Sequence, residues 1–259
     1  MTIPALFVSH GAPTVILDES PVRSFLTKLA DTVSKPDAIL AVSAHWETDN
    51  PMLSRAEAPE TIHDFFGFPE AMYQLRYPAP GAPALAEKTR NLLLEADLGP
   101  VDMAERGLDH GAWVPLMLGW PEAGIPVTQL SIQPHRNPAW HYRLGEALRP
   151  LRDDNVLIMA SGNLTHNLKE FRGHTIDSEP ESWARAFDEW AGWAIAEGRV
   201  DALLDYRRQA PEAVRNHPTD EHLLPLFVAM GAGSPGVPGR HLHKSYTYGV
   251  LAMDAFAFS

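Results

Sequence analysis

Three apolar segments decide the fold, because each is long enough for a buried strand and each leads directly into a polar turn with a histidine. They read Leu6-Phe7-Val8-Ser9-His10-Gly11, Leu40-Ala41-Val42-Ser43-Ala44-His45-Trp46 and Leu157-Ile158-Met159-Ala160-Ser161-Gly162-Asn163-Leu164-Thr165-His166-Asn167. Continuous apolar runs of this kind are typical of parallel strands that are buried on both faces. We therefore expect them to lie in the centre of a sheet that is covered by helices.

Segments of strand length and segments of helical period alternate along the whole chain. Strands are expected at residues 5–8, 38–42, 127–132, 156–160 and 248–256, and helices at residues 21–33, 82–96, 138–148, 183–195 and 221–230. Ser20 and Pro21 are suited to be the N-cap and the first residue of the first helix. The alternation predicts a single α/β domain over residues 1–259, with a central, largely parallel or mixed sheet and helices on both faces.

Charge and composition exclude several classes of function. The chain has 259 residues, 21 Lys and Arg against 33 Asp and Glu, a net charge of −12 and no Cys. The acidic balance argues against nucleic acid or a membrane surface as a partner. Without Cys there is no disulfide, iron–sulfur cluster or thiol catalysis, so any metal must be held by His and carboxylates. No apolar run is long enough to span a membrane and the first residues lack a signal-peptide pattern, so a cytoplasmic protein is expected.

The histidines that follow the three apolar segments indicate a site. Ligands of open α/β sheets bind beyond the carboxyl ends of the strands, where His10, His45 and His166 would meet if their strands are neighbours. Two His with a further His or carboxylate are typical of a non-haem Fe(II) oxygenase or of a catalytic zinc site. Iron suits a site that must bind both an organic chelator and O2, whereas zinc would polarise a carbonyl or a water. The residues alone leave both metals open.

Three further histidines are candidates for the same site. His110 lies in a turn before an expected helix, and either a pocket position or a structural one fits it. His63 belongs to the aromatic loop 61–69, which either covers an aromatic substrate or packs on the surface. His222 is expected to open the last helix beside Glu221, a competing carboxylate ligand. Adjacent residues of a helix point about 100° apart, so only one of these two could face a metal.

Eight motifs in order resemble those of the LigB-type class III extradiol ring-cleavage dioxygenases, in their DOPA 4,5-dioxygenase branch. They are Phe7–Pro13, Val42–Trp46, Thr61–Pro69, Tyr77–Gly81, Leu108–Trp113, Gln129–Ile132, Ala160–Asn167 and His222–Leu226. The resemblance covers nearly the whole chain. It implies an α/β enzyme that uses one Fe(II) and O2 to cleave a catechol, DOPA-like or otherwise substituted, to a muconic semialdehyde.

Site residues also follow from this resemblance. It implies that His10, His45 and His222 bind the metal, that His166 is the catalytic acid and base, and that His110 is a second catalytic residue. Zinc can replace iron in a purified sample, because zinc binds such sites more tightly.

The aromatic loop is the expected substrate-binding element. Phe65 and Phe68 are expected to pack against the catechol ring, with His63 near the outer edge of the substrate. Two other functions are alternatives to the dioxygenase: a zinc-dependent hydrolase with the same histidines, and a non-catalytic LigB-like binding protein. A binding protein is expected to lack acid and base residues, whereas His166 and His110 are both present. No Arg or Lys stands out as a partner for a substrate carboxylate.

Overall fold

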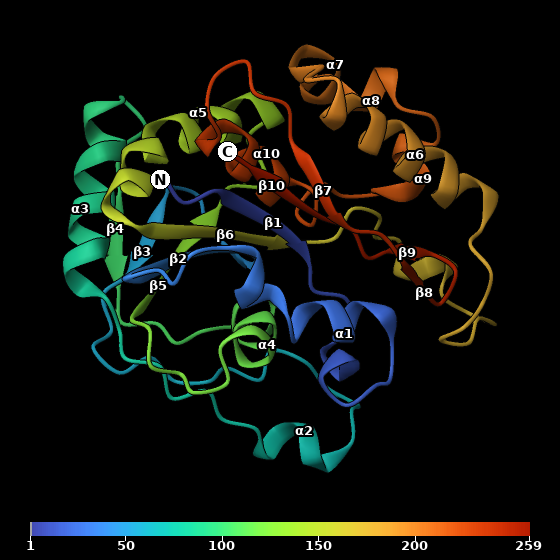
Figure 1. Ribbon diagram of the computed structural model, residues 1–259, viewed down its shortest axis with the longest axis horizontal. Helices are drawn as coiled ribbons and strands as arrows, with labels where there is room; N and C mark the ends of the chain where they lie inside the picture. The colour runs from blue at the N-terminus through green and yellow to red at the C-terminus, as the bar shows by residue number, and fades with distance from the viewer. Residues whose placement is uncertain (1) are drawn as a thin grey trace.

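A computed structural model describes residues 2–259, and one eight-stranded sheet forms its centre (Figure 1). In spatial order its strands are β4 (Asp102–Ala104), β3 (Met52–Ser54), β5 (Val127–Ile132), β2 (Ala38–Glu47), β6 (Val156–Gly162), β1 (Ala5–Ser9), β10 (Ala255–Phe258) and β7 (Arg240–His243). The four neighbours β5, β2, β6 and β1 are parallel, whereas β3, β10 and β7 each run antiparallel to the next strand toward the centre. The sheet is thus mixed with a parallel centre, as the alternation predicted.

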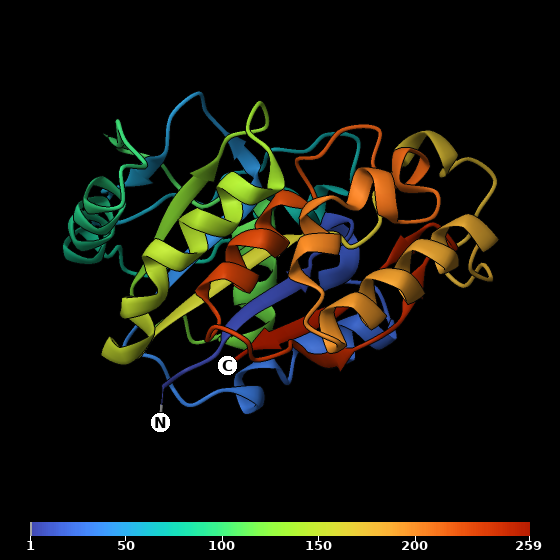
Figure 2. The same ribbon diagram turned by 90° about the horizontal axis from the view of Figure 1, so that it is seen from above.

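Helices cover both faces of the sheet (Figures 1 and 2). One face carries α3 (Pro83–Glu95), α5 (Pro138–Leu148), α6 (Ser182–Ala196) and α10 (Leu224–Ala232), and the other carries α1 (Pro21–Leu26) and α4 (His110–Gly119) with the short 3-10 helices η1 (Pro13–Ile16) and η2 (Leu29–Thr32). Successive side chains of a strand point to opposite faces. Accordingly, Leu40 and Val42 of β2 pack in the first layer, and Ile39 and Ala41 pack in the second.

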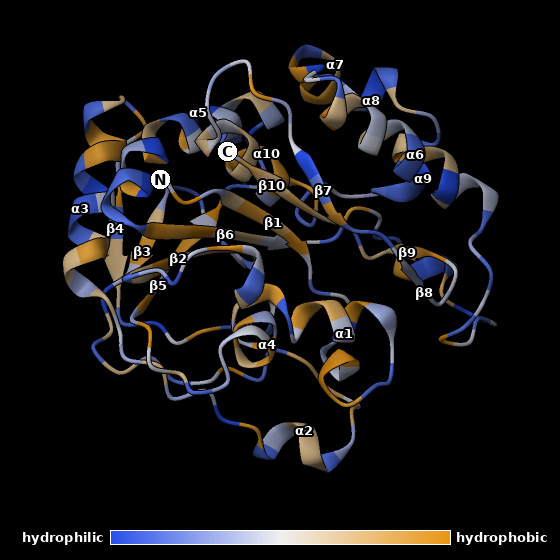
Figure 3. Cartoon of the chain, viewed as in Figure 1, coloured by the Kyte–Doolittle hydropathy of each residue, from blue (hydrophilic) through white to orange (hydrophobic). Residues whose placement is uncertain are grey.

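The remaining elements are short and lie around this sandwich. They are α2 (Glu70–Gln74), η3 (Arg149–Asp154), η4 (Leu168–Glu170), α7 (Val200–Leu204), α8 (Tyr206–Gln209), α9 (Ala213–Asn216) and the strand pair β8 (Tyr246–Thr247) and β9 (Leu251–Ala252). The central strands are apolar and edge strand β7, Arg-His-Leu-His, is polar (Figure 3). A short polar edge discourages pairing with another sheet. None of the helices within residues 2–259 is long and apolar enough to cross a membrane.

Several element boundaries match the sequence prediction. Residues 127–132 and 138–148 coincide with β5 and α5, and α3 and α6 differ from their predicted ranges by one residue at each end. The prediction of one helix over residues 21–33 was wrong. Helix α1 ends at Leu26, and η2 follows after Lys28, whose backbone has φ −110° and ψ 9°. The Thr27 hydroxyl donates to the Ser24 carbonyl, a local bond that competes with helix continuation.

Two predicted elements near the C-terminus also differ. The last helix begins at Leu224 rather than at residue 221, because the Asp220 carbonyl accepts from the backbone N–H of both Leu223 and Leu224 and closes a turn. The predicted strand 248–256 is two strands, β9 and β10. Tyr248 and Gly249 have φ values of 55° and 65°, which no extended strand allows.

The strand order shows that the three strands leading to His10, His45 and His166 are neighbours, which the sequence alone left open. Strands β2, β6 and β1 are adjacent and parallel, so their carboxyl ends meet at one edge of the sheet. His10 directly follows β1, His45 lies two residues before the end of β2, and His166 comes four residues after β6. The sheet therefore delivers three histidines to one place.

A buried histidine of α5 makes the stability of the fold depend on pH. The His141 Nδ1 donates to the Asn137 carbonyl at 3.1 Å, and its Nε2 accepts from the Gln133 N–H at 3.2 Å, a pattern that only the neutral ring can make. Burial lowers the pKa of His141 from 6.5 to about 4.

We expect this histidine to destabilise the fold as the solution is acidified. Between pH 6.5 and 4 the unfolded chain binds a proton here that the folded chain does not, so the free energy of unfolding falls with pH. The slope from this residue is about 1.4 kcal/mol per pH unit. Urea unfolding across this range should give a shallower slope for His141→Gln than for the wild type. The exposed His135→Gln serves as the control with an unchanged slope, and equal slopes for all three proteins would contradict the prediction.

Candidate active site

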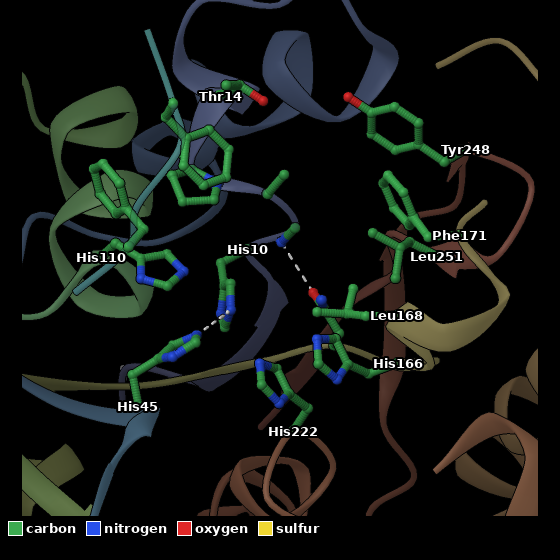
Figure 4. Close-up of a pocket in the computed structure, with 16 residues that line it drawn as sticks. His10, Thr14, His45, His110, His166, Leu168, Phe171, His222, Tyr248 and Leu251 are labelled. Atoms are coloured by element: carbon green, nitrogen blue, oxygen red, sulfur yellow. Dashed lines mark hydrogen bonds between the residues drawn. The ribbon is translucent and has the colours of Figure 1, made fainter. Parts of the chain in front are cut away.

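A cavity of about 460 Å³ opens at the carboxyl edge of the parallel strands, and five histidines line it (Figure 4). They are His10, His45, His110, His166 and His222. These side chains come from segments that are far apart in the sequence: the ends of three strands, the start of α4 and the turn before α10. All five histidines for which a role was predicted at the metal or in catalysis therefore lie on one wall.

Three of these rings point toward a common centre. His10, His45 and His222 each offer one ring nitrogen, and these nitrogens lie within 4.8 Å of one another. The Nε2 atoms of His10 and His45 are 3.0 Å apart, and the ring centroids of His10 and His222 are 5.5 Å apart. A group of three imidazole nitrogens at this spacing is a donor set that suits a divalent metal ion.

The hydrogen bonds of Ser161 fix the tautomer of His10. The Ser161 hydroxyl donates its one proton to the Gly111 carbonyl at 2.5 Å, because a carbonyl can only accept. At 2.9 Å from the His10 Nδ1, the same oxygen must therefore accept. The proton of His10 is on Nδ1, and the lone pair on Nε2 is free and faces His45.

A carboxylate lies at the outer nitrogen of each of the other two rings. The His222 Nδ1 donates to Glu221 Oε1 at 3.0 Å, and the His45 Nδ1 lies 3.6 Å from Asp64 Oδ2. Oxygen acceptors on the outer nitrogen orient a histidine ligand and leave the inner nitrogen free to bind a metal. Glu221, which the sequence named as a rival ligand, thus reaches the outer side of His222. Both side chains can face the cluster because residues 221–223 form a turn rather than a helix.

Burial keeps these rings neutral. It lowers the pKa of His10 and of His222 well below 6.5, and it lowers the pKa of His45 to about 3, with the neighbouring histidines adding to each shift. Only the neutral imidazole can bind a metal. At neutral pH the cluster is therefore ready to accept an ion without first losing protons.

A buried aspartate fixes the position of His110. Asp109 caps α4 by accepting from the Ala112 N–H, and it also accepts from Ser43 of β2 at 2.6 Å and from Gln129 of β5. Burial raises the pKa of Asp109, and the hydrogen bonds from Ser43 and Gln129 counteract this effect. These contacts anchor the first turn of α4 against the sheet. His110, the first residue of α4 and not part of a preceding turn, is thereby held at the cavity.

The next residue, Gly111, allows this close approach. A Cβ at position 111 would lie 2.4 Å from the Ser43 Oγ, 3.0 Å from the His45 ring and 3.3 Å from the His10 ring. Only glycine lets the start of α4 come so near the histidine cluster.

Asp64 joins the aromatic loop to two of the histidines. Its Oδ1 accepts from the His110 backbone N–H at 2.9 Å and lies 3.0 Å from the His110 Nδ1, while Oδ2 faces His45. Burial raises the pKa of Asp64, but the contacts with His110 outweigh burial and hold this pKa at about 2. Asp64 was not among the residues predicted from the sequence. Its position directly before Phe65 in the aromatic loop was the available signal.

His166 lies beside the cluster and stacks on one of its members. The rings of His166 and His222 are 3.5 Å apart at an angle of 10°, and the His166 Nδ1 is 4.0 Å from Glu221 Oε1. Burial lowers the pKa of His166 to about 4, so the ring is neutral at neutral pH. A neutral ring on the cavity wall can accept a proton from a bound molecule.

Of the three residues that the sequence assigned to substrate binding, two line the cavity and one does not. Phe65 and Phe68 line the cavity, and their rings contact each other with centroids 5.2 Å apart. His63 is not on the cavity wall, because its Nε2 lies 3.1 Å from the Leu75 carbonyl and its ring packs among Phe65, Tyr73 and Trp113. The structure thus places two of the three in reach of a bound molecule.

Comparison with known proteins agrees with this site. The family described as the catalytic LigB subunit of aromatic ring-opening dioxygenase matches residues 4–256. A Beta vulgaris protein named 4,5-DOPA dioxygenase extradiol is 42% identical over 257 residues, which are 98% of this chain and 95% of that protein. A protein of the same name from Escherichia coli K12 is 41% identical over 233 residues, or 89% of this chain and 85% of that protein. The crystal structure of an uncharacterized protein from Escherichia coli K12 superposes with a TM-score of 0.83 at 35% identity, covering 99% of this chain and 100% of that one.

The fold and the histidine-lined cavity thus define a metal-dependent aromatic ring-opening dioxygenase. The chain belongs to the LigB family, and it is an extradiol ring-cleavage dioxygenase. The resemblance seen in the eight sequence motifs is confirmed.

Removing the Ser161 hydroxyl is expected to weaken metal binding. In Ser161→Ala the His10 Nδ1 loses its acceptor and the Gly111 carbonyl loses its donor, so the His10 ring is free to turn. Loss of such an outer partner costs about 10- to 100-fold in metal affinity. Competition with a chelator measures the change, and Ser131→Ala, which removes a buried hydroxyl of β5 away from the cavity, is the matched control. Equal affinities for the two variants would show that Ser161 does not orient His10.

Proposed function

We propose that this enzyme uses Fe(II) and O2 to cleave the ring of a catechol outside its two hydroxyls, giving a muconic semialdehyde. The observation that carries the proposal is the group of three neutral histidines whose outer nitrogens are engaged, next to two further histidines in the same cavity. The names of the relatives, which specify a 4,5-cleaving DOPA dioxygenase, support a catechol as the substrate class.

His10, His45 and His222 would hold the metal. Their donor set fits a 2+ ion, because each inner nitrogen is free and each outer nitrogen faces an oxygen of Ser161, Asp64 or Glu221. When bound, Fe(II) supplies coordination of both substrate oxygens and electron transfer to O2. Zinc would occupy the same three nitrogens in a purified sample, because it binds such sites more tightly.

His166 and His110 would move protons. The His166 Nδ1 is directed toward Glu221, which leaves Nε2 to take the second phenolic proton of the catechol and to return it later in the reaction. The His110 Nδ1 is directed toward Asp64, which leaves its Nε2 to bond a substrate or dioxygen oxygen. A carboxylate therefore lies beside the Nδ1 of each of these histidines, and Nε2 is the nitrogen proposed to act on the substrate.

Anaerobic loading with Fe(II), followed by a simple catechol and air, tests the proposed reaction. A yellow ring-opened product, one O2 consumed per catechol and both atoms of labelled O2 in the product are expected. Labelled oxygen from water in place of O2, or a hydrolysed ester substrate with a zinc-loaded sample, would instead support the hydrolase.

His166→Ala is expected to separate catalysis from metal binding. Metal content and anaerobic catechol binding should stay near the wild-type values, while turnover falls by about 10² to 10⁴, the usual contribution of a positioned acid and base. His174→Ala, which removes a half-buried histidine outside the cavity lining, controls for general damage. Loss of metal in His166→Ala would make this residue a ligand, and full activity would make it structural.

The two cavity-lining phenylalanines are expected to act on substrate binding. Phe65→Ala and Phe68→Ala should raise the KM for catechols several-fold, because ring packing contributes about 0.5–1.5 kcal/mol beyond the area buried. Phe66 is 92% exposed in the same loop, so Phe66→Ala is the matched control. A lowered melting temperature at unchanged KM would show that Phe65 and Phe68 only pack the loop.

A further inference from the structure

The outer part of the cavity is apolar and carries no charge. Leu168, Phe171 and Leu251 form one side of it, opposite the aromatic loop, and Thr14 and Tyr248 lie at the end away from the histidine cluster (Figure 4). Within residues 2–259, the sixteen residues that line the cavity include no Lys, Arg, Asp or Glu. A charged group in this region would therefore have no partner of opposite charge on the cavity wall.

Tyr248 is held in an unusual backbone conformation at this outer end. Its φ of 55° is rare for a bulky residue, and its N–H donates to the Ile176 carbonyl at 3.1 Å. The following Gly249 also has a positive φ, and a Cβ there would lie 2.6 Å from the Glu179 carbonyl oxygen. The Tyr248 ring packs on Phe171 with centroids 4.3 Å apart. The fold thus fixes the tyrosine at the cavity.

Two hydroxyls face each other at that end. Those of Thr14 and Tyr248 point toward one another across the outer opening in Figure 4. Burial raises the pKa of Tyr248 and the nearby Asp18 raises it further, while the contact with the Thr14 side chain lowers it; the net shift is upward, so the phenol stays protonated and can donate. An incoming carboxylate would meet the negative charge of Asp18 there, whereas a neutral hydroxyl or carbonyl group could bond to both side chains.

Charged groups do occur close to the cavity, but outside its lining. Lys169 and Arg172 belong to the same segment as Leu168 and Phe171, and both are exposed. They are the cations that a carboxylated substrate could still reach from the opening. Any test of the outer subsite must therefore include them.

We propose that Thr14 and Tyr248 form a subsite for an uncharged hydrogen-bonding group at the end of a short side chain on the catechol. The preferred substrates are then neutral 4-substituted catechols, and zwitterionic DOPA is a poorer one. This inference rests on the proposed catechol cleavage. Its physical basis is that burying a charge without a partner costs far more than burying a hydroxyl that is hydrogen-bonded.

A matched series of catechols tests the subsite. 4-Ethylcatechol, 4-(2-hydroxyethyl)catechol, dopamine and 3,4-dihydroxyphenylacetate differ mainly in the end group of a two-carbon side chain, and DOPA carries both charges. We expect the highest kcat/KM for the hydroxyethyl compound, values at least about tenfold lower for the two compounds that carry a carboxylate, and an intermediate value for dopamine, whose ammonium group Asp18 attracts. A charged compound that matches or exceeds the neutral ones would overturn the proposal.

Binding without turnover separates this proposal from the proposed reaction. Calorimetry of the same compounds with the anaerobic, metal-loaded enzyme should give the same order of Kd values. If the order holds but no compound is cleaved, the proposed reaction fails and the subsite stands. If the compounds are cleaved but bind without regard to charge, the subsite fails and the reaction stands.

Substitutions of cavity residues test which side chains cause the preference among these catechols. Tyr248→Phe should reduce the preference for hydroxyethyl over ethyl by about three- to tenfold, the worth of one hydrogen bond. Tyr142→Phe, which removes a hydroxyl from α5 outside the cavity lining, should leave the preference unchanged. Leu168→Arg should improve the relative kcat/KM of the carboxylate compound, and Leu168→Gln should not. A wild-type preference for carboxylates that disappears in Lys169→Ala or Arg172→Ala would overturn the proposal.

Discussion

The Ser161 hydroxyl is the contact on which the rest of the site depends, because it joins three elements at one point. Its own strand, β6, lies between β1 and β2, with Ser161 opposite Val8 on one side and Ser43 on the other. From there the hydroxyl donates to Gly111 at the start of α4 and accepts from His10 after β1. A shift of either strand by one residue would turn the histidine-bearing side chains to the opposite face. The parallel register and the metal-binding geometry are therefore one constraint.

The outer partners of the cluster also balance charge. Five histidines share the cavity wall, and a divalent ion among them would bring two positive charges into a buried place. Asp64 and Glu221 lie on the outer side of His45 and His222, where carboxylates would compensate that charge, while neither side chain lines the cavity itself. Buried charge is tolerated when it is paired. The inner space stays free for substrate because the carboxylates act through the imidazoles.

Local sequence patterns predicted the site residues that strands position. They did not predict the orientation of the residues that turns position. His10, His45 and His166 follow apolar runs, and a sheet with those runs adjacent must bring them together. His222 was a candidate beside Glu221 at the expected start of the last helix, and only the family resemblance selected it as the metal ligand, since nothing local places that helix start against the sheet edge. Only one of His222 and Glu221 was expected to face the metal, because a helix was predicted to begin at residue 221, whereas residues 221–223 form a turn. Tyr248 was placed in a strand, although the adjacent Gly249 was a signal for a positive φ.

The aromatic loop is anchored to the histidine cluster at one end and exposed at its tip. At one end Asp64 is held by the His110 backbone and by the outer nitrogens of two histidines. Two residues later Phe66 is 92% exposed and contributes nothing to the cavity wall. The anchored end and the free tip are separated by Phe65, whose ring reaches both the cavity and His110. Phe65 is therefore a residue through which this loop shapes the substrate space, whereas the exposed tip lies outside that space and Asp64 holds the loop beside His45 and His110.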